Sequence, residues 1–122
     1  MTKTIQAVFI DPFEQESKIV ELKCKNNDID LEECYKLIGC DLVEFVYFGE
    51  KEIMILDEEG LLKVNKPFKL EGVGQQFYMG KALIVQEKGE RCVSLDSDKI
   101  ANIMNKVSFP TLQQIGQEVL NG

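Results

Sequence analysis

The sequence predicts an α+β fold, an antiparallel β-sheet meander with two or three short helices on one face. Three observations predict it. Short alternating or β-branched stretches recur along the chain, tight turns with glycine separate several of them, and only three segments have helical signals. The order strand-strand-helix-strands-helices has too few crossovers for a doubly wound sheet, which leaves an antiparallel sheet as the expected core.

The first two strands are expected at residues 4–13 and 18–23. In the first strand, Ile5, Ala7 and Phe9 alternate with Gln6, Val8 and Ile10. Asp11-Pro12 ends this strand, because proline cannot donate to a ladder. The second stretch alternates again, so the two are predicted to form a hairpin.

The clearest helix signal follows at residues 30–39. Asp30 is placed as the N-cap and Glu33 as its capping-box partner. The residues at helical spacing are Leu31, Cys34, Tyr35 and Ile38. Gly39 is positioned to end the helix after about two turns.

Strands dominate the rest of the chain up to residue 95. The predicted strands have the sequences DLVEFVYF, EIMIL, LLKV, KALIVQ and RCVSL, while residues 65–80 read as irregular. Turns are expected at Gly49, at residues 57–60 and at residues 87–90.

Two helices are expected to close the chain. Asp96 or Ser97 caps the first, whose apolar face carries Ile100, Ile103, Met104 and Val107. Pro110 breaks it, and Thr111 with Gln114 forms a capping box for a last short helix.

The length of 122 residues fits a single domain spanning residues 1–122, with 110–122 as a C-terminal helical extension. Helices of two or three turns cover a sheet incompletely, so we expect a homodimer or higher homo-oligomer that buries the remainder. The N-terminus has no signal peptide pattern, and no apolar run approaches the ~20 residues of a membrane span. A soluble cytoplasmic protein with four free thiols is expected.

Composition excludes several functional classes. The net charge of −7 disfavours a nucleic-acid or anionic membrane binder, and Arg91 is the only arginine. The absence of histidine removes the usual nucleophile activation and the commonest transition-metal ligand. The cysteine spacing matches no zinc motif, and no complete phosphate-binding glycine motif occurs. We therefore expect no enzyme, no metal and no cofactor.

One segment, residues 61–81, departs from this acidic background. It carries four lysines against one glutamate, with polar amides, three glycines and the aromatic rings of Phe68 and Phe77. Diffuse positive charge, backbone N–H groups and aromatic faces suit a small anionic ligand with a base, such as a nucleotide. The alternative is a solvated loop whose phenylalanines belong to the core. The predicted ligand-binding residues are Lys63, Asn65, Lys66, Lys69, Gln75, Gln76, Tyr78 and Lys81, with Arg91 as a further phosphate contact.

The layout resembles an uncharacterised family, domain of unknown function 3846. The elements that carry the likeness are YKLIGCDLVEFV, EIMILDEEGLLKVN and GKALIVQEKGERCVSLDSDKI, over about residues 3–107. The turn at Lys88-Gly89-Glu90 departs from the acid-glycine turn expected there. The resemblance implies a phage or mobile-element accessory protein made inside a bacterial cell.

Three non-catalytic functions follow as hypotheses. The first is a sponge that sequesters a nucleotide-type immune signal of the host. The second is an inhibitor that binds a host defence protein, of the acidic DNA-mimic type, although acids and lysines interleave along the chain. The third is an accessory of mobile-element replication or gene regulation.

Overall fold

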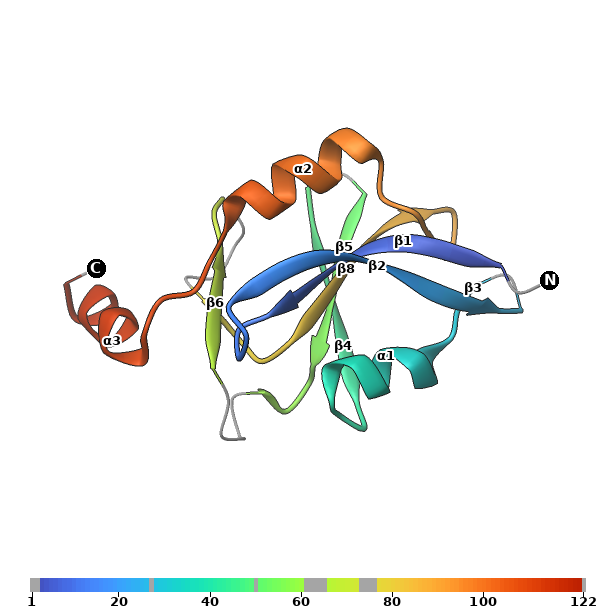
Figure 1. Ribbon diagram of the computed structural model, residues 1–122. Coiled ribbons are helices and arrows are strands. Elements are labelled where there is room, and N and C mark those ends of the chain that lie inside the picture. The colour runs from blue at the N-terminus through green and yellow to red at the C-terminus, as the bar shows by residue number, and fades with distance from the viewer. Residues whose placement is uncertain (1–2, 27, 50, 61–65, 73–76, 122) are drawn as a thin grey trace.

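Two antiparallel sheets organise the chain in the computed structural model, which describes residues 3–26, 28–49, 51–60, 66–72 and 77–121 (Figure 1). The larger sheet contains β1 (Thr4–Asp11), β2 (Glu16–Lys25), β3 (Asp28–Ile29), β4 (Val43–Phe48), β5 (Glu52–Asp57), β8 (Ala82–Lys88) and β9 (Arg91–Val93). The smaller sheet contains β6 (Pro67–Leu70), β7 (Tyr78–Met79) and β10 (Val107–Ser108). The helices are α1 (Leu31–Ile38), α2 (Ser97–Lys106) and α3 (Leu112–Asn121).

The strand order of the larger sheet is β3-β2-β1-β8-β5-β4, with β9 paired to β8. All of these pairs are antiparallel, which confirms the predicted α+β class. The sheet is not a simple meander, because β8 enters between β1 and β5. Ile84 of β8 lies opposite Val8 on one side and Met54 on the other.

The central strands are buried on both faces, and each face has its own helix. On one face Ala7, Phe9 and Leu83 pack with Cys34 and Ile38 of α1. The alternate residues of the same strands form a second cluster with α2, and they include Val8, Ile10, Met54, Ile84, Ile100 and Ile103. Figure 1 shows α2 above the strands of the larger sheet and α1 below them. The prediction that the helices share one face therefore differs from the structure, since an apolar run does not say which helix covers which side.

Strands β6 and β7 of the smaller sheet lie where the sequence predicts irregular chain. The prediction of Val107 on the helix face is wrong, because α2 ends at Lys106 and Val107 is extended in β10. Phe68 is fully buried on β6, opposite Tyr78 of β7, and β6 also pairs with β10 after α2. These strands are short, so they leave little periodic signal in the sequence. The predicted LLKV strand lies outside the described residues.

Side-chain capping accounts for the start of α1 and of α3, whereas Asp96 at the start of α2 makes no side-chain capping bond. The Asp30 side chain accepts a hydrogen bond from the Glu32 N–H, and Gly39 has the positive φ of 79° that ends α1. The expected reciprocal bond from Glu33 is wrong, because its carboxylate instead accepts the N–H of Lys23 on β2. The capping box of α3 is confirmed by bonds in both directions between Thr111 and Gln114.

Candidate functional site

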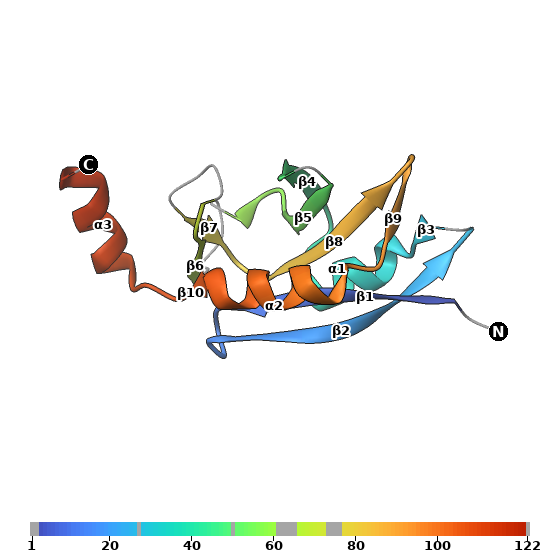
Figure 2. The same ribbon diagram turned by 90° about the horizontal axis from the view of Figure 1, so that it is seen from above.

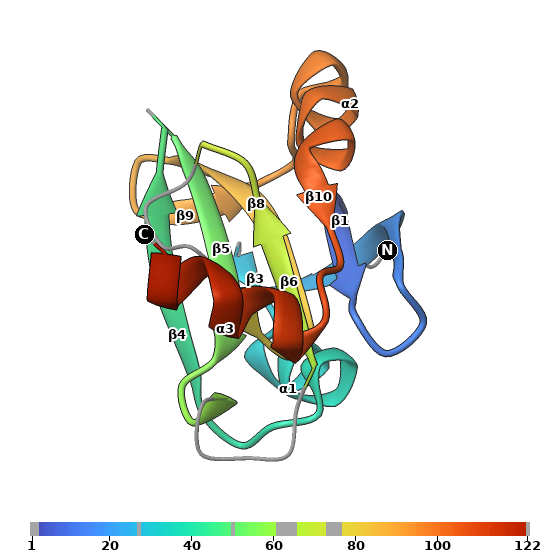
Figure 3. The same ribbon diagram turned by 90° about the vertical axis from the view of Figure 1, so that its left-hand side faces the viewer.

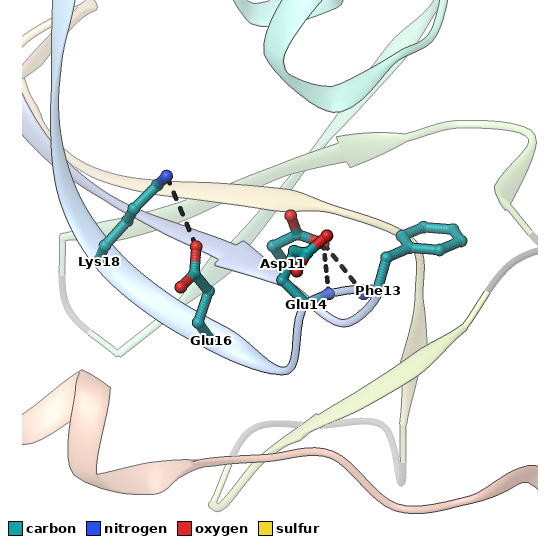
Figure 4. A network of polar contacts seen from close by, with 5 residues as sticks. All are labelled: Asp11, Phe13, Glu14, Glu16 and Lys18. Carbon is teal, nitrogen blue, oxygen red and sulfur yellow. Dashed lines mark hydrogen bonds and ion pairs between the residues drawn. The ribbon is translucent and has the colours of Figure 1, made fainter.

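A tight turn between β1 and β2 forms one wall of the candidate site (Figure 4). Asp11 is buried, and its Oδ1 accepts hydrogen bonds from the N–H groups of Phe13 (2.9 Å) and Glu14 (3.3 Å). Pro12 is fully buried, and Gln15 takes a positive φ of 54°. The turn is thus held by local hydrogen bonds of the kind that aspartate makes to the residues that follow it.

A groove of about 250 Å³ lies between this turn, the start of β6 and the segment that leads into α3. This groove is called the Lys66 groove below. Its lining is mainly apolar, and its residues are Pro12, Gln15, Lys66, Pro67, Phe109, Pro110, Thr111 and Leu112. The N-terminal end of α3 forms part of the wall, and a helix N-terminus carries a partial positive charge. Figure 3 shows α3 in front of the smaller sheet.

Two of the predicted lysines come together at this end of the molecule. The Gly80 N–H donates to the Lys66 carbonyl oxygen at 2.8 Å, which places Lys81 next to Lys66 along the paired chain. The Lys81 Nζ lies 5.7 Å from the centre of the Phe13 ring, in the turn that borders the Lys66 groove. Lys66 is therefore in the wall of the groove, whereas Lys81 lies next to Lys66 but outside the lining.

The predicted aromatic residues lie elsewhere. Tyr78 is buried and stacks on Phe68 with 5.5 Å between ring centroids, so both rings belong to the core on the α2 face. Phe77 borders a small notch of about 70 Å³ whose wall also contains Glu44, Asp57 and Glu58. Three carboxylic acids beside Phe77 make its surroundings unfavourable for a phosphate group.

The remaining predicted residues do not gather at the Lys66 groove. Lys69 is half-buried on β6, opposite Ser108. Arg91 is exposed on β9 and pairs with Lys88 at the far end of β8 from Lys81. Strand β8 has 7 residues, which separates its ends by about 20 Å. Lys63, Asn65, Gln75 and Gln76 lie outside the described residues.

A second groove, of about 160 Å³, lies at the opposite end of β6 and is bordered by α2 and the β4–β5 turn. Its charged groups are partly neutralised by an ion pair of 3.0 Å between Lys99 Nζ and Glu52 Oε1. Burial by itself raises the pKa of Glu52, but hydrogen bonds from the Lys51 N–H and from Lys99 outweigh it and lower that pKa. A stable carboxylate in the wall disfavours an anionic ligand here.

The thiols of Cys34 and Cys92 belong to the core of the α1 face. Burial, with acidic neighbours, raises the pKa of Cys34 to about 12 and that of Cys92 to about 12. A thiolate is the reactive form of cysteine, so neither thiol is a ready nucleophile. Within the described ranges, no three His, Cys, Asp or Glu side chains are grouped closely enough to hold a metal ion.

Sequence reasoning missed most of the groove wall. Pro12, Gln15, Phe109 and Pro110 come from two segments that are far from residues 61–81 in the sequence. Their only local signal is the proline at each site, which marks a turn but not a shared surface.

Comparison with known proteins identifies the family. The model described as Domain of unknown function (DUF3846) matches residues 5–108, and the chain belongs to this family. Helix α3 lies beyond the matched residues. No curated protein and no solved structure matches the chain. None of the described helices has the length and apolar character needed to cross a membrane.

Proposed function

We propose that this member of the DUF3846 family is a non-catalytic binder that sequesters a small nucleotide-type anion in the Lys66 groove. The observation that carries the proposal is a mainly apolar groove of about 250 Å³ that has Lys66 in its wall, with Lys81 beside Lys66 along the paired chain. Small-ligand sites are concave and mainly apolar, with a few polar groups that fix the orientation of the ligand.

The groove wall has two kinds of surface, and each suits a different part of a nucleotide. Pro67, Phe109 and Pro110 supply apolar surface for a flat base. Lys66, Lys81 and the N-terminal end of α3 supply positive charge for a phosphate. The groove is slightly smaller than the 300–1,000 Å³ typical of sites for drug-sized ligands, so it fits one nucleotide unit.

Sequestration without turnover is the role that we propose for this binding. The resemblance of the chain implies a phage or mobile-element setting, in which a protein of this kind would withdraw a nucleotide signal from a host defence system. The protein would act in the bacterial cytoplasm and needs no cofactor for this role.

An acidic inhibitor that mimics DNA is less well supported. Such a mimic needs a surface on which carboxylates are segregated from lysines. On β2 the exposed side chains of Glu16, Lys18, Glu21 and Lys23 alternate in sign. This mixed pattern reduces the field that a basic partner would recognise.

Calorimetry with nucleoside monophosphates and cyclic dinucleotides tests the proposal. We expect at least one to bind the wild type, and Lys66→Ala with Lys81→Ala to weaken that binding at least about tenfold, a loss of 1.4 kcal/mol or more. Arg91→Ala is the matched control, because it removes a cation about 20 Å away along β8 and should leave affinity unchanged. Affinity weaker than about 1 mM for the whole panel would contradict the proposal.

A further inference from the structure

Strand β4 forms an edge of the larger sheet and has one neighbouring strand, β5, within the described part of the chain. The Glu58 N–H donates to the Leu42 carbonyl oxygen at 3.1 Å, in the same register that places Val43 opposite Asp57. Hydrogen-bonded and non-hydrogen-bonded pairs alternate in an antiparallel ladder. The N–H and C=O groups of Val43, Phe45 and Tyr47 therefore point away from β5, toward the open edge.

The same positions carry apolar surface. Phe45 is 40% exposed and Tyr47 is 65% exposed, opposite Ile55 and Ile53 on the α1 face of the sheet. Proteins usually protect edge strands with lysine, proline or a bulge. Strand β4 contains no lysine and no proline, and Glu44 is its only charged residue. Figures 2 and 3 show β4 at the margin of the sheet, opposite β2.

We propose that β4 pairs antiparallel with β4 of a second copy of this chain, about a two-fold axis through Val46. The outward-facing backbone groups are the same on both copies, so the strand is self-complementary under such an axis. In this register Phe45 lies opposite the partner's Tyr47, and aromatic cross-strand pairs stabilise a sheet. The interface is independent of the Lys66 groove.

Charge disfavours one alternative register. An axis through Glu44 would place two glutamates directly opposite each other, which is destabilising. The axis through Val46 instead places Glu44 opposite the partner's Phe48. The net charge of −7 per chain opposes association, but screening limits that repulsion to a range of about 8 Å at physiological salt.

Light scattering with size-exclusion chromatography tests the interface. At about 100 μM, we expect the wild type to have twice the chain mass of 13.9 kDa. Phe45→Lys with Tyr47→Lys should give the single-chain mass with an unchanged circular dichroism spectrum, because both side chains are largely exposed. Ile19→Lys on β2 is the matched control, since Ile19 is 51% exposed at the opposite margin, and it should stay dimeric. A wild-type monomer, or a dimer that survives the β4 substitutions, would overturn the proposal.

A disulfide tests the register. The two Val46 positions would form a non-hydrogen-bonded pair with Cα atoms about 4.5 Å apart. That distance lies within the range of about 4.4–6.8 Å that a disulfide spans. Val46→Cys should give a covalent dimer on mild oxidation, whereas Ile19→Cys and the wild type should not. If the protein is dimeric but Val46→Cys forms no covalent dimer, the proposed pairing is wrong.

Discussion

The two faces of the larger sheet are built from the same strands but are covered differently. The α1 face is covered by one helix of 8 residues, which leaves Phe45 and Tyr47 of β4 exposed. The α2 face is covered by a helix of 10 residues and also by the smaller sheet, whose Phe68 is fully buried. The comparison teaches where surfaces for binding arise. The thinly covered face leaves two aromatic side chains exposed on the edge strand β4, and the doubly covered face has a groove at the margin of the smaller sheet.

The largest effect is expected from Phe68→Ala, which removes the fully buried side chain that packs the smaller sheet against the α2 face. Truncating a buried phenylalanine costs about 3–5 kcal/mol, because both the buried surface and the packing around the cavity are lost. We expect that loss in the free energy of unfolding by chemical denaturation, together with faster hydrogen exchange in β6 and β10. Phe13→Ala, at a ring that is 42% exposed, should cost less than about 1 kcal/mol. Equally accelerated exchange in α1 would show that the two faces are not covered independently.

The thiols of the α1 face are expected to make stability fall at alkaline pH. Burial raises the pKa of Cys34 and Cys92 from 9.0 to about 12, so the folded chain keeps protons that the unfolded chain releases. Stability is therefore fully present below pH 9 and is lost as pH rises toward 12.

Denaturation midpoints measured across that range test this expectation. Cys34→Ala with Cys92→Ala should flatten the alkaline decline relative to the wild type, while the titrations of lysine and tyrosine stay common to both proteins. The same slope in both proteins would contradict the assigned cause.

Local signals in the sequence identified much of the fold. The caps at Asp30 and Thr111, the terminating Gly39 and the alternation of β1 and β2 each depend on residues close together in the chain. The covering of the two faces was not predictable in this way. The central strands have apolar residues at both odd-numbered and even-numbered positions, which point to opposite faces of the sheet. Their pattern is therefore equally consistent with a helix on either side.

Of the candidate site, only the positive charge was predictable from the sequence. The lysine excess directed attention to residues 61–81, and the structure places Lys66 in the groove wall with Lys81 next to it along the paired chain. The groove wall depends on contacts between β6, the β1–β2 turn and Phe109, which are distant in the sequence. Burial of Tyr78 against Phe68 likewise depends on the pairing of β6 with β7. Strands this short have too little periodic pattern for that pairing to be predicted from the sequence.

The smallest effect concerns the ion pair between Glu52 and Lys99 on the α2 face. The lowered pKa of Glu52 stabilises the folded chain above the ordinary value of 4.5, and that contribution is lost as pH falls. Lys99→Met removes one hydrogen bond to the carboxylate and leaves the bond from the Lys51 N–H. We expect the pKa of Glu52 to rise toward 4.5, measured by NMR titration of its carboxyl carbon. Lys88→Met, at an exposed residue of β8, is the control. An unchanged pKa of Glu52 would mean that Lys99 does not stabilise this carboxylate in solution. The second groove on the α2 face would then depend on packing alone.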